Sequence, residues 1–211
     1  ILAEQKGIKE KNILLGNGSD EVLDLLLRAF CEPKQDNIIT LPPTYGMYKV
    51  LSGINLVENR EVLLTNDFQP NVEGILNTID NITKLLFICS PNNPTGNSFS
   101  TSIIEELLTS FNGLVIIDEA YIDFGGQSAI ELVDRYDNLL VVQTFSKSRS
   151  LAGSRVGFAI GHADLIEGLV RVKDSFNSYP IDRLAELSAV AAINDVDYFN
   201  SCCEKIITTR D

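Results

Sequence analysis

The stretch LVIIDEAY, residues 114–121, joins four apolar residues to a polar, turn-forming tail. A short run that is continuously apolar, instead of alternating with polar residues, is typical of a strand buried on both faces of a parallel sheet. Two further runs, at 85–89 and 139–143, have the same character and also end in polar residues. These segments predict central strands that present functional groups at their carboxyl ends.

Amphipathic segments separate the predicted strands. Four more strands are expected at 12–15, 37–41, 54–57 and 157–160. Helical patterns occupy 2–6, 20–30, 45–51, 72–79, 102–111 and 165–172, and Ser19 is a candidate N-cap for the second of them. Strands that alternate with helices predict an α/β fold: a doubly wound, mostly parallel sheet with helices on both faces.

The last part of the chain departs from this alternation. Helical patterns at 181–193 and 198–209 follow one another, with a break at 194–197 and no strand between them. We therefore expect one domain, 1–211, in which 181–211 is a helical exit from the sheet. Both ends of the chain lie inside helical patterns and the first residue is Ile1, so we expect a fragment of a longer protein.

Composition narrows the range of functions. The net charge of −12 disfavours nucleic acid and anionic membranes, and no apolar run approaches the ~20 residues that span a bilayer. No signal peptide is visible. The four cysteines form no CxxC pair and His162 is the only histidine, which argues against a zinc site or a Ser-His-Asp triad. We expect a cytoplasmic protein with free thiols and no metal.

Polar segments follow the predicted strands at 16–21, 90–96, 118–121 and 144–155. Because the carboxyl ends of parallel strands meet at one edge of a sheet, these segments should line one cleft. Together they supply a lysine, a carboxylate, an arginine, hydroxyls and a helix start. A cofactor with an aldehyde and a phosphate needs such a set: an amine to bind the aldehyde, a carboxylate to tune the ring, and donors for the phosphate.

Five segments carry a specific resemblance. They read GNGSDE at 16–21, PPTYGMY at 42–48, SPNNPTGN at 90–97, IIDEAYIDF at 116–124 and TFSKSRSLAGSRVGFAIG at 144–161. Together, in this order, they resemble the fold-type I pyridoxal-phosphate (PLP) aminotransferases, and are most similar to the histidinol-phosphate group within them. The resemblance spans about 12–161, which is most of the chain.

The resemblance implies a role for each matching residue. Lys147 would bind PLP covalently and move a proton at the substrate Cα, and Asp118 would pair with the pyridine nitrogen. Asn93 and Tyr121 would contact the phenolic oxygen, and Tyr45 would stack on the ring. Lys147, Asp118 and Tyr121 would form the catalytic set. The residues implied in phosphate binding are Ser19, Asp20, Glu21, Thr144, Ser146 and Arg155, of which Ser19, Asp20 and Glu21 would act mainly through backbone N–H groups.

The same resemblance implies an activity. It is the transfer of an amino group between a small amino donor and a 2-oxo acid, in histidine biosynthesis from histidinol phosphate and 2-oxoglutarate to imidazole acetol phosphate and glutamate. A homodimer is also implied. The family's substrate-binding arginines, its N-terminal arm and a tyrosine of the second subunit lie outside the matched segments. We therefore expect residues 1–211 alone to be inactive in transamination.

Several alternatives remain beside this hypothesis. An aromatic aminotransferase or a threonine-phosphate decarboxylase would share Lys147, Asp118 and Asn93, and a non-catalytic PLP-binding regulator would keep the lysine. A dinucleotide-binding site is disfavoured because Glu21 stands where the third glycine of the fingerprint belongs. Glu119 is expected to be structural. We assign no substrate role to Asn177 or Tyr179, because the family's usual order is altered there.

Overall fold

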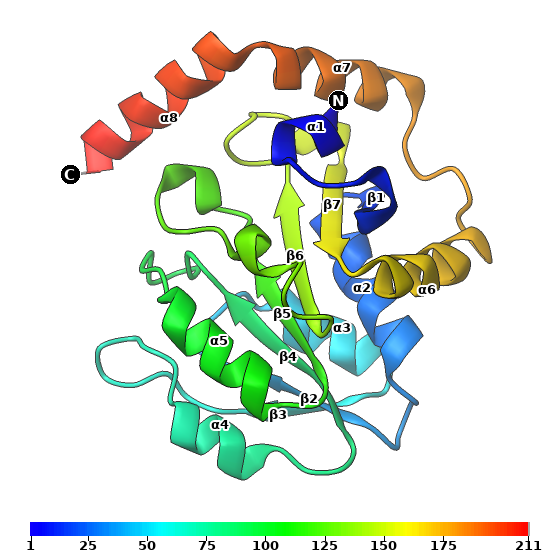
Figure 1. The fold of residues 1–211 in the computed structure, drawn as a ribbon, viewed down its shortest axis with the longest axis vertical. Coiled ribbons are helices and arrows are strands. Elements are labelled where there is room, and N and C mark those ends of the chain that lie inside the picture. Colours follow the sequence, from blue (N-terminus) through cyan, green and yellow to red (C-terminus); the bar gives the residue numbers. More distant parts are fainter. Residues whose placement is uncertain (211) are drawn as a thin grey trace.

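In the computed structural model, which describes residues 1–210, seven strands form one sheet in the order β1-β7-β6-β5-β4-β2-β3 (Figure 1). The strands are β1 (Ile13–Asn17), β2 (Asn37–Thr40), β3 (Glu58–Glu61), β4 (Thr83–Cys89), β5 (Leu114–Asp118), β6 (Leu139–Thr144) and β7 (Val156–Gly161). Only β7 runs antiparallel to its neighbours, β1 and β6. The other pairs are parallel, so the predicted mostly parallel α/β sheet is confirmed.

Helices cover both faces of this sheet. Side chains of β5 alternate between two buried clusters: Val115 and Ile117 pack into one, Leu114 and Ile116 into the other. The first cluster includes α4 (Val72–Thr78), α5 (Thr101–Ser110) and α7 (Arg183–Asn194), and the second includes α2 (Ser19–Phe30), α3 (Met47–Ile54) and α6 (Ala163–Asp174). Because both faces are buried, the central strands can be continuously apolar, as their sequences indicate.

The carboxyl ends of β1, β2, β4, β5 and β6 share one edge of the sheet, where β7 begins. Helix α1 (Leu2–Lys6), α7 and α8 (Val196–Arg210) lie along the top of the view in Figure 1, the side on which β6 ends. Four short 3-10 helices complete the fold: η1 (Glu10–Asn12), η2 (Ile122–Phe124), η3 (Ala129–Leu132) and η4 (Ala152–Ser154). Among the described residues, no helix is long and apolar enough to cross a membrane.

Three local predictions need correction. The strand expected at 54–57 is wrong, because helix α3 continues through Ile54 and the strand begins only at Glu58. The sequence of β3, ENRE, is polar because this is an edge strand with exposed side chains. The helix expected from Tyr45 begins at Met47, and the cap position before α2 belongs to Gly18, not to Ser19.

Two glycines bring the β1–α2 turn against the start of β7. Gly18 has a backbone φ of +80°, a conformation that residues with a Cβ adopt only with strain. Across from it, a Cβ on Gly157 would lie 2.2 Å from the Ser19 backbone nitrogen. The missing Cβ atoms let helix α2 begin directly beside the end of the sheet.

We predict that Gly157→Ala destabilises the protein by about 1–3 kcal/mol, because the new methyl group overlaps backbone that cannot move aside cheaply. Gly168→Ala is the matched control. Gly168 lies within α6 with no atom near its would-be Cβ, so alanine there should raise the free energy of unfolding by up to about 1 kcal/mol. Urea unfolding of both variants measures the two effects. Equal changes would show that the close approach at Ser19 is unimportant.

Candidate active site

A cavity of about 240 Å³ opens at the carboxyl edge of the sheet. Its walls come from the loops after β1, β2, β4, β5 and β6, together with η4. Ten of the eleven residues predicted from the sequence line it: Ser19, Asp20, Tyr45, Asn93, Asp118, Tyr121, Thr144, Ser146, Lys147 and Arg155, with Cys89, Ala120 and Ala152 completing the lining. Segments more than 100 residues apart in the sequence therefore meet in one place, as the strand order requires.

Asp118, the last residue of β5, places a carboxylate at the base of this cavity. Its side chain is buried, and the Tyr48 hydroxyl donates a 2.7 Å hydrogen bond to Oδ2 while the Ala120 backbone nitrogen donates to Oδ1 at 3.1 Å. Burial raises the pKa of the Asp118 carboxyl, and the bonds from Tyr48 and Ala120 oppose that rise. Asp118 is thus held where it can face a positively charged group in the cavity.

Lys147 reaches the same cavity from the loop that follows β6. Its Nζ lies 5.3 Å from the centroid of the Tyr121 ring. The loop is fixed by backbone hydrogen bonds, from Ser150 nitrogen to Lys147 oxygen and from Leu151 nitrogen to Phe145 oxygen, each 3.0 Å long. The amine is therefore presented by an ordered turn at the strand end.

The same cavity also contains donors that can bind an anion. Ser19 begins α2, whose first backbone N–H groups lack partners within the helix. The hydroxyls of Thr144 and Ser146 bond each other at 3.0 Å, and Arg155 Nη2 lies 3.4 Å from Asp20 Oδ2. A Cβ on Gly18 would come within 2.3 Å of the Arg155 guanidinium, so glycine keeps this cradle open.

Tyr45 joins the loop after β2 to the start of α2. It precedes α3, and its hydroxyl donates a 3.0 Å hydrogen bond to Asp20 Oδ1. Asn92, which is buried, fixes the loop that carries Tyr45: its Nδ2 donates to the Pro43 carbonyl at 2.9 Å, and its Oδ1 accepts from Thr44 at 3.0 Å. The two asparagines of the motif therefore have different roles. Asn93 lines the cavity, and Asn92 joins the loop after β4 to the loop after β2.

Glu21 is the predicted site residue that does not line the cavity. Its Oε2 accepts a 2.5 Å hydrogen bond from the Asn17 backbone nitrogen, and its Oε1 accepts one of 2.6 Å from Asn177 Nδ2. Glu21 therefore secures the start of α2, and through Asn177 it ties the segment after α6 to that helix. The Glu21 carboxylate is therefore already bonded, so a role in phosphate binding through the Glu21 backbone N–H stays a prediction, and Asn177 has a structural contact.

Glu119 turns away from the cavity into a buried polar cluster, in keeping with its expected structural role. The Ser128 hydroxyl and Gln143 Nε2 each donate to Oε2 at 2.7 Å, and the Ala129 backbone nitrogen donates to Oε1 at 2.6 Å. Burial nevertheless raises the pKa of Glu119 to about 7. Through Glu119, the residue after Asp118, this cluster joins the η2–η3 loop to β5 and β6.

Known proteins resemble this chain in sequence. The family model of class I and II aminotransferases matches residues 2–211. The chain belongs to the class I and II aminotransferase family. It is 52% identical over its whole length to the histidinol-phosphate aminotransferase of Flavobacterium johnsoniae, and 46% identical, over 92% of its length, to that of Bacteroides thetaiotaomicron. The chain spans 60% and 56% of these two proteins.

The fold of this aminotransferase chain also matches solved structures. It superposes on the histidinol-phosphate aminotransferase of Sinorhizobium meliloti in complex with pyridoxal-5'-phosphate with a TM-score of 0.90 and 24% identity, covering 99% of this chain and 57% of that one. The aspartate aminotransferase of Thermus thermophilus with maleate gives a TM-score of 0.89 at 23% identity, covering 98% and 57%. The aminotransferase fold thus extends through the described chain.

Sequence reasoning missed two side chains at the site. Tyr48 lies inside the quoted segment PPTYGMY, yet only Tyr45 is assigned a role there, because a tyrosine three residues along a predicted helix is typical of core packing. Cys89 ends a strand that is otherwise apolar, which is also typical of core. Tyr48 could have been noticed as a buried phenol that needs a hydrogen-bond partner.

The raised pKa of Glu119 gives a test with a definite sign. The folded state holds the Glu119 proton up to about pH 7, whereas the ordinary value is 4.5, so the free energy of unfolding should fall between these pH values. Glu119→Gln cannot ionise and should lack this fall. We expect the difference between wild type and variant to change by about 3 kcal/mol between pH 4.5 and pH 8.

Denaturant unfolding at several pH values measures this difference, and Glu106→Gln, an exposed position on α5, is the control. An unchanged gap between wild type and Glu119→Gln across the range would mean that the Glu119 carboxyl is not perturbed by burial.

Proposed function

We propose that the whole protein is a PLP-dependent aminotransferase that converts histidinol phosphate and 2-oxoglutarate to imidazole acetol phosphate and glutamate. One observation carries the chemistry: Lys147, buried Asp118 and the Arg155 cradle line a single cavity. The choice of substrate is supported by relatives about 50% identical that bear the name histidinol-phosphate aminotransferase. The chain covers about 60% of these relatives, so the activity proposed is that of the full-length protein.

The residues fit PLP in size, charge and placement. The cradle of Ser19, Ser146 and Arg155 offers hydroxyl, guanidinium and helix N-terminal donors, the groups that bind a phosphate dianion. Gly18 leaves room where a side chain would collide with Arg155. Asp118 lies in the same cavity as this cradle and supplies the negative charge that a protonated pyridine nitrogen requires.

Bound PLP would act as an electron sink that weakens the Cα–H bond of an amino acid. This chain's residues would do the rest. The Lys147 amine would bind the cofactor aldehyde and afterwards take and return the Cα proton. Asp118 would keep the proton on the pyridine nitrogen. Tyr121 and Asn93 would donate to the phenolic oxygen, and Tyr45 would cover the ring.

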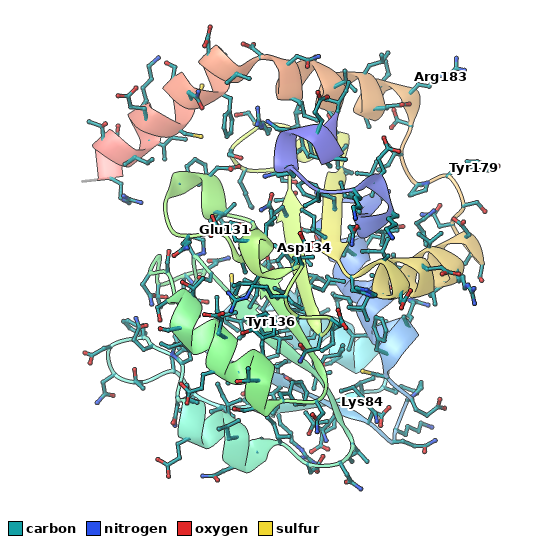
Figure 2. All side chains as sticks on the ribbon, in the orientation of Figure 1. Lys84, Glu131, Asp134, Tyr136, Tyr179 and Arg183 are labelled. Atoms are coloured by element: carbon teal, nitrogen blue, oxygen red, sulfur yellow. The ribbon has the colours of Figure 1, made fainter. Side chains whose placement is uncertain are left out.

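Partners and placement follow as part of this proposal. The substrates would be a small amino donor and a 2-oxo acid. Residues 1–211 would form the large PLP-binding domain, and the groups that hold the substrate carboxylate would lie outside it. The full-length protein would be a cytoplasmic homodimer. The dimer is supported by the apolar side chains exposed around α7: Leu184 is 77% exposed, Leu187 66% and Tyr179 94%. Tyr179 stands out from the segment before α7 in Figure 2.

We predict that the full-length protein transaminates histidinol phosphate with 2-oxoglutarate in the presence of PLP, and that Lys147→Ala abolishes both this activity and the near-ultraviolet to visible absorbance of lysine-bound cofactor. Phenylalanine as donor in parallel assays tests the aromatic alternative. Lys173→Ala, a buried lysine of α6 away from the cavity, is the control and should keep the absorbance band. A Lys147→Ala protein that turns over like wild type would refute the assignment.

Asp118→Asn should separate cofactor binding from catalysis. Asparagine fills the same volume, so PLP should still bind, but the charge-assisted hydrogen bond to the pyridine nitrogen is lost. Such a bond contributes about 1.5–3 kcal/mol, which corresponds to a rate loss of one to two orders of magnitude. Single-turnover kinetics with Cα-deuterated donor should show slower proton abstraction and a larger isotope effect. Wild-type rates from this variant would contradict the role.

A further inference from the structure

We propose that Tyr48 is a positioning residue of the active site, whose phenol orients the Asp118 carboxylate and stabilises its negative charge. This inference deepens the proposed function and rests on it. Tyr48 does not line the cavity, so it would act on the reaction through Asp118.

The contact is short and fully buried. Tyr48 is 1% exposed and Asp118 2%, and the phenol donates to Oδ2 over 2.7 Å. A hydroxyl at such depth is costly unless it finds a partner, and phenylalanine would fill the same apolar space without that cost. The hydroxyl is therefore explained by its hydrogen bond to the carboxylate.

The Tyr48 ring is held firmly enough to aim its hydroxyl. It stacks on Phe87 of β4, with ring centroids 5.0 Å apart and an interplanar angle of 21°. On another side it meets the Tyr45 ring edge to face, at 5.6 Å and 85°. Tyr48 thus contacts both Asp118 and Tyr45, the two groups proposed to touch the pyridine ring. A shift of Tyr48 would disturb both.

The charges around Asp118 explain why a donor is needed there. Burial works against the ionised carboxylate, and so does Asp20 at the start of α2, while Lys147 favours it. Cys89 of β4 and Tyr45 also face this carboxylate, and burial raises the pKa of Cys89 to about 12 and the pKa of Tyr45 above its ordinary range. Tyr121 is a further titratable group in the cavity that Asp118 lines.

The Tyr48 phenol itself stays protonated. Its pKa lies well above the ordinary value, so Tyr48 can stabilise Asp118 only by donating a hydrogen bond.

Tyr48→Phe removes the hydroxyl and keeps the ring. Tyr136→Phe is the matched control, because the Tyr136 hydroxyl also donates to a carboxylate, Glu105 Oε1 at 3.1 Å. Tyr136 lies just before the amino end of β6 and does not line the cavity. Three measurements on the full-length protein are needed. They are the titration of the Asp118 carboxyl by ¹³C NMR without cofactor, the equilibrium affinity for PLP, and the pH profile of activity.

We expect Tyr48→Phe to move the Asp118 pKa upward by about one unit or more, which is a tenfold loss in the preference for the ionised carboxylate, and to weaken PLP binding. The acid limb of the activity profile should move to higher pH in parallel. Tyr136→Phe should change none of the three. An unshifted Asp118 titration in Tyr48→Phe, or the same losses in both variants, would overturn the proposal.

Incorporation of 3,5-difluorotyrosine at position 48 keeps the inference testable if Tyr48→Phe does not fold. The more acidic phenol donates a stronger hydrogen bond, so the Asp118 pKa should move down, opposite to the phenylalanine variant. No downward shift would overturn the proposal. The titration without cofactor also separates the two claims: a protein that shows the shifts but does not bind PLP would refute the proposed function and retain the Tyr48–Asp118 coupling.

Discussion

The carboxylate of Asp118 lies at the end of a central strand, at the wall of the cavity, and the residue is only 2% exposed. A buried charge is tolerated only if it is paired or bonded, so the surrounding elements must supply partners. Helix α3 supplies the Tyr48 phenol, the turn after β5 supplies the Ala120 N–H, and the loop after β6 brings the Lys147 charge into the same cavity. The placement of three elements is thus tied to one carboxylate.

The sheet makes this placement possible. Six strands, β1 to β6, end at one edge and β7 starts there, so loops from distant parts of the sequence meet without long excursions. Glycines at 18 and 157 let the start of α2 approach that edge closely. Glu119, which directly follows β5, accepts hydrogen bonds from Ser128 and from Gln143 of β6, and so joins the η2–η3 loop to these two strands. Strand ends, and the loops that hydrogen bonds tie to them, therefore set the geometry of the site.

Much of this could be predicted from the sequence, and for physical reasons. Continuous apolar runs such as 114–117 identify strands buried on both faces, and the polar residues after them meet because parallel strands end together. The prediction was wrong where local pattern and tertiary context disagree: the polar edge strand β3 resembles a loop, and Ile54 continues a helix. Glu21 follows the site motif in sequence, yet its side chain is used by Asn17 and Asn177. Contacts between segments far apart, such as Tyr48 with Asp118, leave no trace in spacing.

The central claim is that the cavity binds PLP through the Lys147 amine. Borohydride reduction makes the link between a lysine amine and an aldehyde permanent, so the full-length protein loaded with PLP can be reduced, digested and mapped by mass spectrometry. The account predicts that the PLP-bearing peptide contains Lys147 and that the label sits on that residue. Stoichiometric label on another lysine such as Lys6 or Lys173, or a protein that carries none after loading, would contradict it.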